Sequence, residues 1–146
     1  MNIDKLLSAT LVRILNDKDV AGEIGLGDIL GSYGGVKGSR KPQGVTNPYF
    51  LVFPMPTNKN SDYQTYNGTI MIKFTLDNYS GGNAKTELMG QVGERLDELF
   101  DDKPLDIGGY TNYNLEVNQL HFPLFDPDFE DEHYLSARIK YNIIER

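Results

Sequence analysis

The sequence contains no cysteine, so a disulfide scaffold, a thiolate zinc site and a cysteine nucleophile are all excluded. It also has no apolar run close to the roughly 18 residues that a membrane-spanning helix needs. The segment that begins with residues 1–5 lacks the basic region and uninterrupted apolar run of a secretory signal. At 146 residues, 39% of them hydrophobic, the chain can bury one core. We therefore expect a single domain, residues 1–146, made and kept in a cytosol, with no membrane partner.

Positive charge is also scarce. Lysine and arginine together number 14, against 21 aspartates and glutamates, which gives a net charge of −7 and a pI near 4.7. Binding to the phosphates of nucleic acid needs clustered cations whose counterion release supplies the affinity, and this composition argues against it. The exception is local, because Lys37, Arg40 and Lys41 fall together in a glycine-rich segment.

Two helices are indicated by apolar residues that recur every three or four positions. The first carries Ile3, Leu6, Leu7, Leu11, Ile14 and Leu15. The second ends near Phe100 and carries Ala84, Leu88, Val92, Leu96 and Leu99. Its last turn is followed by acidic residues, which the helix dipole disfavours, so this end indicates either a tolerated cost or a cationic partner. Between the helices, residues 19–30 contain several glycines, so any helix there is short and broken.

Four strands are indicated by alternation or by apolar character. Residues 48–54 are apolar on both faces, as is typical of a strand inside a sheet, and residues 68–76 alternate between apolar and polar. Residues 113–124 change phase, which predicts a bulge near Asn118 and Gln119. The last strand forms a hairpin with that segment and keeps one phase, with Leu135, Ala137, Ile139, Tyr141 and Ile143 inward and Ser136, Arg138, Lys140 and Asn142 outward.

The order α-β-β-α-β-β predicts an α+β fold, in which an N-terminal and a central helix pack on one face of a mostly antiparallel four-stranded sheet. Extended loops are expected at residues 31–47 and 55–67, and an acidic hairpin tip at residues 126–132. Aromatic and charged residues in such loops are typical anchors of protein interfaces. The candidate interface residues are Tyr33, Lys37, Arg40, Lys41, Tyr63, Tyr66, Asp128, Phe129, Glu130 and Asp131.

No motif for catalysis or cofactor binding is complete. The glycines of residues 25–31 superficially resemble a dinucleotide fingerprint, but the third comes one position late and no strand precedes it. The tip from Asp126 begins like a calcium loop, yet lacks the glycine and glutamate that such a loop needs. His121 and His133 lie on opposite arms of the final hairpin, where zinc would need two carboxylates as well. We predict no cofactor, no metal and no enzymatic activity.

Several segments together carry a resemblance to a known family. They are residues 47–53 (Asn-Pro-Tyr-Phe-Leu-Val-Phe), 68–74, 82–88 at the start of the second helix, Leu105 after it, and 131–134 before the last strand. With an N-terminal helix in front, this order resembles the tail terminator, or tail-completion, proteins of long-tailed bacteriophages. The glycine-rich stretch 31–44 departs from the family pattern.

The resemblance implies a subunit of a ring, usually a hexamer, that caps the tube of polymerised tail protein, stops its growth and offers a surface to the head–tail connector. The partners would be further copies of the chain, the tail tube protein and the connector, in the tail or neck of a virion assembled in the host cytoplasm. DNA would pass through the lumen without specific binding, because an acidic wall lets it slide. We expect cations of one subunit to meet acids of the next, namely Lys37, Arg40 and Lys41 with Asp128, Glu130 and Asp131.

Two alternatives stay open. One is another ring protein of the neck, such as a head-completion protein, because these folds are small and their sequences permissive. The other belongs to a different class, a small α+β ligand-binding or metal-dependent enzymatic domain that uses His121 and His133.

Overall fold

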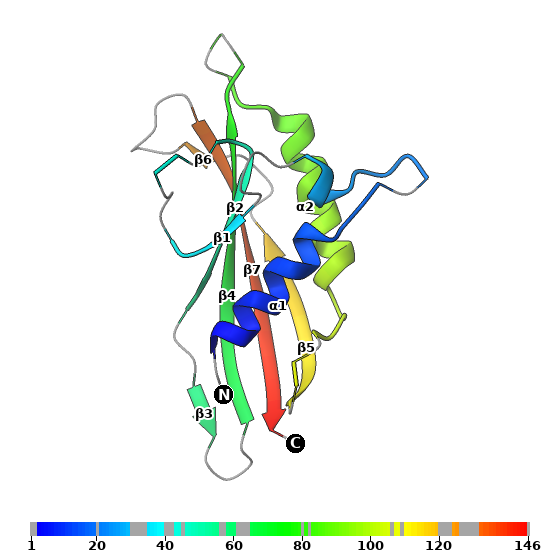
Figure 1. Cartoon of the computed structure of the whole chain (residues 1–146), viewed down its shortest axis with the longest axis vertical. Helices are drawn as coiled ribbons and strands as arrows, with labels where there is room; N and C mark the ends of the chain where they lie inside the picture. Colours follow the sequence, from blue (N-terminus) through cyan, green and yellow to red (C-terminus); the bar gives the residue numbers. More distant parts are fainter. Residues whose placement is uncertain are drawn as a thin grey trace.

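The computed structural model describes most of the chain: residues 3–19, 21–29, 35–39, 43–44, 46–55, 58–60, 65–79, 81, 83–105, 107–108, 110–119, 124–125 and 132–145. Figure 1 shows a curved sheet of long strands with two helices beside it. Neither helix in these ranges is long and apolar enough to cross a membrane.

The two predicted helices are present. Helix α1 (Ile3–Leu15) buries Leu6, Leu7 and Ile14, and the buried hydroxyl of Thr10 donates a 2.9 Å hydrogen bond to the Leu6 carbonyl. Helix α2 (Thr86–Phe100) begins two residues later than its apolar stripe suggested and buries Met89, Val92, Gly93, Leu96 and Phe100. A short 3-10 turn, η1 (Leu26–Asp28), is the broken helix expected in the connection between α1 and the sheet.

The sheet has the spatial order β1-β2-β4-β7-β5, with β3 added to β4 and β6 to β7. The strands are β1 (Gly35–Lys37), β2 (Tyr49–Pro54), β3 (Asn58–Asn60), β4 (Thr65–Asp77), β5 (Tyr110–Gln119), β6 (Leu124–Phe125) and β7 (Glu132–Glu145). All pairs are antiparallel except β1 with β2, which is parallel. The α+β class, the four long strands and the final β5–β7 hairpin are therefore confirmed, in a sheet that is not purely antiparallel.

Three details of the predicted strands were wrong. The segment expected as a loop from residue 31 to residue 47 contains strand β1, and the loop expected from 55 to 67 contains β3 and the first residues of β4. Tyr66 consequently lies in a strand, opposite Lys59 of β3, and not in a loop. The irregularity in β5 falls between Tyr113 and Glu116, earlier than the bulge expected at residues 118–119.

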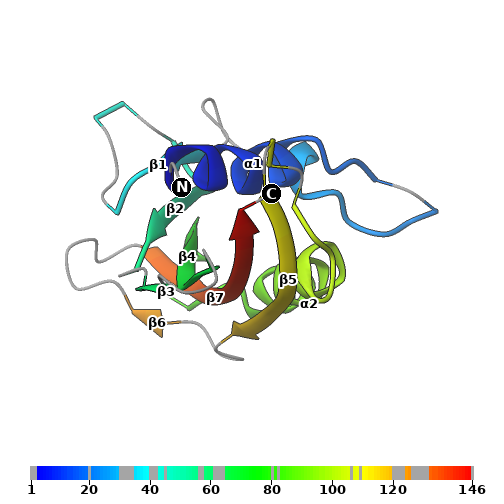
Figure 2. The ribbon, with the colours of Figure 1, turned by 90° about the horizontal axis from the view of Figure 1, so that it is seen from below.

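Both helices cover the same face of the sheet. One hydrophobic cluster joins inward residues of β2, β4 and β7, such as Phe50, Phe74 and Ile139, to the buried residues of α1 and α2. The Phe50 and Phe74 rings are 4.7 Å apart at an interplanar angle of 35°, an offset contact that aromatic pairs favour. Seen along the strands in Figure 2, the sheet curves and α1 lies across its inner side. Every second residue of β4 and β7 therefore faces the helices, as the alternation predicted.

The connection between α1 and η1 passes so close to itself that only glycine fits at residue 27. The Gly27 N–H donates a 2.8 Å hydrogen bond to the Asp17 carbonyl, and a Cβ atom on Gly27 would lie 2.2 Å from the Leu15 carbonyl oxygen. That contact is with the backbone, which cannot turn aside as a side chain would. Gly90, on the exposed side of α2, has nothing within 4 Å of its Cβ position.

We predict that Gly27→Ala lowers the free energy of unfolding by about 2 kcal/mol or more, because the backbone must shift to admit the methyl group. The matched control, Gly90→Ala, should raise it by about 0.5–1 kcal/mol, because alanine loses less conformational entropy inside a helix. Urea denaturation followed by circular dichroism measures both changes. Equal effects of the two substitutions would show that the close approach at Gly27 is wrong.

Candidate interaction surfaces

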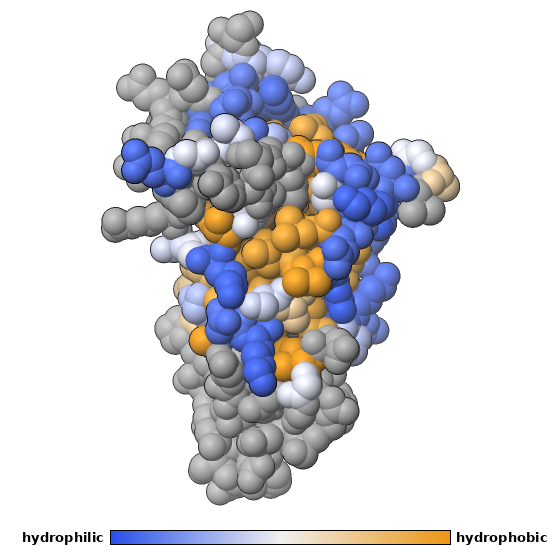
Figure 3. Space-filling model, viewed as in Figure 1, coloured by the Kyte–Doolittle hydropathy of each residue, from blue (hydrophilic) through white to orange (hydrophobic). Residues whose placement is uncertain are grey.

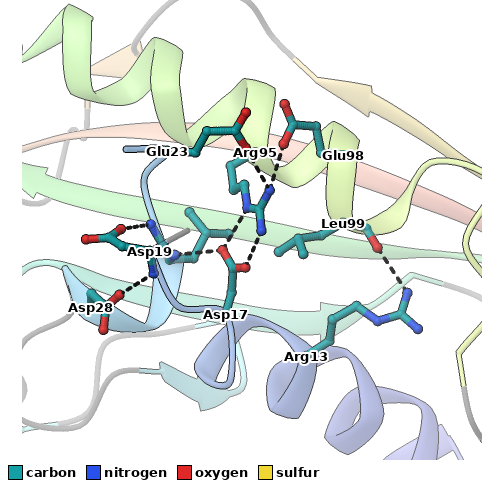
Figure 4. A network of polar contacts seen from close by, with 10 residues as sticks. Arg13, Asp17, Asp19, Glu23, Asp28, Arg95, Glu98 and Leu99 are labelled. Carbon is teal, nitrogen blue, oxygen red and sulfur yellow. Dashed lines mark hydrogen bonds and ion pairs between the residues drawn. The ribbon is translucent and has the colours of Figure 1, made fainter. Parts of the chain in front are cut away.

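The most connected polar cluster of the described residues joins the two helices through Arg95 of α2. Arg95 Nε and Nη2 donate hydrogen bonds of 2.9 and 2.6 Å to the two carboxylate oxygens of Asp17, which follows α1. Asp17 also accepts the backbone N–H of Leu26, at 2.9 Å. The side chains of Asp17 and Arg95 are only 5% and 19% exposed. Figure 4 shows this pair between α2 and the connection that follows α1.

Two further carboxylates surround the same guanidinium. Arg95 Nη1 lies 2.7 Å from Glu98 Oε2, one turn along α2, and 3.5 Å from Glu23 Oε2. The hydrogen bonds that Arg95 donates to Asp17 and to Glu98 hold the pKa of Arg95 above its usual value. Burial raises the pKa of Asp17, but the hydrogen bonds from Arg95 and Leu26 outweigh it and leave that pKa below its usual value.

The end of α2 receives a cation from α1. Arg13 Nη1 donates hydrogen bonds to the carbonyls of Leu99 (3.1 Å) and Lys103 (2.8 Å), and Nη2 donates to that of Pro104 (2.6 Å). Its guanidinium also lies 5.4 Å from the centre of the Phe100 ring. The carbonyls at a helix C-terminus lack partners within the helix and carry partial negative charge. Arg13 therefore places a positive charge at the end of α2, where it contacts backbone carbonyls and not the acidic side chains.

The helical side of the molecule carries an apolar groove. It has a volume of about 460 Å³ and is lined by Ala9, Val12, Arg13, Asn16, Asp17, Leu99 and Leu105. Val12 in this groove is 53% exposed, so an apolar side chain of α1 faces solvent there. In Figure 3 this side shows an apolar area with hydrophilic margins. Such patches on a protein surface are typical of contacts with other proteins.

A second, smaller cavity of about 190 Å³ lies between α2 and the connection that follows α1. It is lined by Gly22, Glu23, Ile24, Gln91, Glu94, Arg95 and Glu98. Three of these are carboxylates and one is a guanidinium that already binds Asp17. The cavity therefore has a surplus of negative charge.

The opposite face of the sheet differs in character. Tyr49 and Leu51 of β2 form a small buried cluster there with Val36 and Phe53. Farther across the sheet, Lys73 Nζ lies 4.1 Å from the centre of the Tyr134 ring, a cation–π contact. The outward residues Arg138 and Lys140 of β7 are both exposed, as the alternation predicted.

Of the predicted interface residues, Lys37 is the one whose side chain is described. Lys37 Nζ lies 2.8 Å from Asp4 Oδ1 and 3.1 Å from Ser8 Oγ, so it ties β1 to α1 within the chain. Tyr66 lies in β4, as reported above. Tyr33, Arg40, Lys41, Tyr63, Asp128, Phe129, Glu130 and Asp131 lie outside the described residues. The predicted contact between the cations at 37–41 and the acids at 128–131 of a neighbour stays a prediction, and for Lys37 it competes with Asp4.

For the histidine alternative, the structure describes one of the two residues, His133. His133 Nδ1 donates a 2.6 Å hydrogen bond to Asn78 Oδ1, so its ring is held in place, although nothing in the sequence had indicated a partner. His121 lies outside the described residues. Within the ranges that the structure covers, no three histidine, aspartate or glutamate side chains are grouped as a metal site would need.

Sequence reasoning did not find the Asp17–Arg95 pair. The two residues are 78 positions apart, and each is one of many charged residues in a chain that is 24% charged. One signal was available. Arg95 lies three residues after Val92 and four before Leu99, so it borders the apolar stripe of α2, where a long side chain is half-buried.

A second missed contact fixes one end of the sheet. Asn47 Nδ2 donates hydrogen bonds of 2.6 Å to Asp77 Oδ1 and 2.8 Å to Glu132 Oε1. Asp77 and Glu132 are directly opposite each other on β4 and β7, so two carboxylates share one amide group. The segment that enters β2 is thereby held against the ends of two other strands.

Comparison with known proteins gives a likeness in structure only. No protein-family model matches the chain, and no curated protein matches its sequence. A protein of known structure that bears no functional name superposes with a TM-score of 0.65 at 16% identity, over 100% of this chain and 98% of its own. A chain from the virion of a native gene transfer agent particle superposes with a TM-score of 0.60 at 12% identity, over 97% and 95%. These values show that the fold is shared along the whole chain.

We predict that Asp17→Asn lowers the free energy of unfolding by about 3 kcal/mol, because it leaves the guanidinium of Arg95 buried beside a neutral amide. Glu98→Gln is the matched control and should cost less than about 1 kcal/mol, since Glu98 is 52% exposed and its pair is near the surface. Chemical denaturation at pH 7 measures both. A loss at Glu98 as large as that at Asp17 would contradict the assignment of the buried pair.

The same pair predicts how stability depends on pH. The pKa of Asp17 is lowered in the folded chain, so its contribution is complete above the ordinary carboxyl value near 4 and is lost as the pH falls through the folded value. The difference in unfolding free energy between wild type and Asp17→Asn should be constant above about pH 5 and should narrow below about pH 4. Denaturation at pH 3, 4, 5 and 7 tests this. If the difference in unfolding free energy between the two chains widened below pH 4, the pKa of Asp17 would be raised in the folded chain and not lowered.

Proposed function

We propose that this chain is a structural, non-enzymatic protein of a virus-like particle, and specifically a tail terminator. In this role, copies of the chain form a ring that caps the tail tube, stops its elongation and joins it to the head connector. The observation that carries the proposal is the likeness, over almost the whole of both chains, to a chain of a gene transfer agent virion. The resemblance of residues 47–53, 68–74 and 82–88 to tail terminators supports the same role from the sequence.

The surfaces of the subunit are of the kind that an assembly protein needs. A ring subunit that also binds a tube and a connector needs several separate contact areas. The apolar groove between α1 and α2 and the outward face of the sheet lie on opposite sides, so both are available at once. The net charge of −7 suits a ring through which DNA passes, because an acidic wall does not hold phosphates.

A ring protein of the neck is the nearest other assignment, and its binding partner distinguishes it. A tail terminator binds the end of a tail tube, whereas a head-completion ring binds the portal side of a capsid. The groove and the sheet face fit either partner, so the proposal is decided by which of the two purified structures the chain binds.

We predict that the purified chain binds one end of preformed tail tubes and stops their growth. The experiment adds the chain to polymerising tail tube protein from the same particle and follows tube length by negative-stain electron microscopy. The expected result is short tubes with a ring of about six copies at one end. Light scattering of the chain alone, at high and low concentration, gives the ring mass independently.

Two results would contradict the proposal. Tubes that grow to the same length with and without the chain would exclude capping. Binding to capsids in the absence of tubes would favour the neck assignment. Addition of the destabilised Gly27→Ala variant provides the control for effects of unfolded protein on polymerisation.

A further inference from the structure

The outward face of the sheet carries a group of three basic residues. Arg138 of β7 is directly opposite Met71 of β4, and Lys140 is opposite Thr69. Lys73 is two residues farther along β4 and contacts Tyr134. Directly opposite residues of antiparallel strands point to the same face, so these three cations share one surface with Met71.

Few acids share the centre of that surface. The register with β5 places Asn118 opposite Arg138 and Glu116 opposite Lys140. Asp77 and Glu132 lie on the same face at the far end of β4 and β7, where both bind Asn47. Among the side chains that the structure describes, which do not include that of Glu116, no acid forms an ion pair with Arg138 or Lys140. The middle of the sheet is thus locally basic in a protein of net charge −7.

The exposed side of α2 has the opposite charge. Glu87, Glu94, Glu98, Asp101 and Asp102 are exposed along it and just beyond its end. With Glu23 of the preceding connection, Glu94 and Glu98 line the 190 Å³ cavity around Arg95. Because α2 packs on the inward face of the sheet, its exposed side and the basic sheet face point in opposite directions.

We propose that the basic sheet face of one copy docks against the acidic side of α2 in the next copy. Here Arg138 and Lys140 would lie against Glu23 and Glu94. A contact between two different patches on opposite sides of a subunit is head-to-tail, and it closes into a ring when the rotation between copies permits. The inference rests on the proposed function for the closed ring, but the contact itself is defined by this chain alone.

The spacing of the charges fits such a contact. Residues two apart on a strand face are about 7 Å apart, which is the separation of Arg138 and Lys140 along β7. Glu23 and Glu94 line the same 190 Å³ cavity, so these two acids are also close neighbours. Two neighbouring cations therefore match two neighbouring acids. Met71 lies directly opposite Arg138 on the same face. Methionine and arginine are both enriched at protein interfaces.

A second copy is a better occupant than nucleic acid. Every copy brings one acidic helix face for each basic sheet face, so the charges are matched in number. The repulsion between the net charges of two copies comes mainly from charges farther apart than the screening length of about 8–10 Å, so salt weakens it. The opposite charges in contact are screened much less. Three cations would neutralise only a few phosphates, which gives weak binding to DNA at physiological salt.

The test is a charge swap between two variant chains. One variant is Arg138→Glu with Lys140→Glu, and the other is Glu23→Lys with Glu94→Lys. Each should weaken self-association, measured by light scattering and analytical ultracentrifugation, by at least about tenfold, because like charges then face each other. The control, Lys5→Glu with Lys103→Glu, changes the net charge by the same amount as the first variant and should associate as wild type does. All changes are at exposed residues. Thermal unfolding of each variant checks that the fold is kept, above all for Glu23→Lys, because Glu23 Oε2 lies 3.5 Å from Arg95 Nη1.

Mixing the two variants gives the decisive result. In an alternating ring, each reversed sheet face meets a reversed helix face, so the mixture should assemble although neither variant does so alone. Such a ring can close only with an even number of subunits. The chain that carries all four substitutions should also recover assembly, because both sides of each contact are reversed.

Several outcomes would overturn the inference, and one would leave it standing without the proposed function. A mixture that stays monomeric, or a wild-type chain that is monomeric even at millimolar concentration, excludes the contact. Loss of binding to a short DNA duplex, with unchanged self-association, in Arg138→Glu with Lys140→Glu would assign the face to nucleic acid. If self-association follows the swap but the wild type does not cap tubes, the contact stands and the tail terminator role fails. If the wild type caps tubes and both variants cap them equally well, the tail terminator role stands and the proposed contact fails.

Discussion

The ion pair between Asp17 and Arg95 is the contact on which the arrangement of the helical layer depends. A carboxylate that is only 5% exposed is costly unless its oxygens are hydrogen-bonded, and here Arg95 and the Leu26 amide occupy both of them. The backbone carbonyl of Asp17 also accepts a hydrogen bond from the N–H of Gly27. One residue therefore fixes the end of α1, the turn η1 and the middle of α2 relative to one another, while the sheet beneath requires only that apolar residues face it.

The parts of the fold that follow from a local period could be predicted from the sequence. In β7 buried and less buried residues alternate from Leu135 to Ile143, and the stripe of α1 keeps its helical spacing, because each has one buried side. Strand β2, apolar on both faces, lies between β1 and β4 as such a strand should. These features need no knowledge of distant residues, so a single sequence contains them.

The remaining features depend on distant residues or on segments too short to show a period. Strand β1 spans Gly35–Lys37, and three residues cannot reveal alternation, so its parallel pairing with β2 was not predictable. The Asp17–Arg95 pair joins residues 78 positions apart, and Asn47 reaches Glu132 across 85. For the candidate site, the sequence predicted interface residues in loops, and most of these lie outside the described residues, so they stay a prediction. The opposite charges on β7 and α2 were not singled out from the sequence. Composition marks loops as exposed, but it does not show which regular elements keep one face uncovered.

The layering of the fold explains why the subunit has two unlike surfaces. Both helices cover one face of the sheet, so the polar residues of β4 and β7 must lie on the other face, and the polar residues of α2 must lie on the side away from the sheet. The layering itself does not determine the sign of each charge. In this chain the strand residues Lys73, Arg138 and Lys140 are basic, and the charged residues that are exposed on α2 are acidic. A self-complementary two-fold contact would place each surface against itself and bring like charges together. Only a head-to-tail contact joins the two unlike surfaces, and the same polarity would give every subunit a defined direction within a ring.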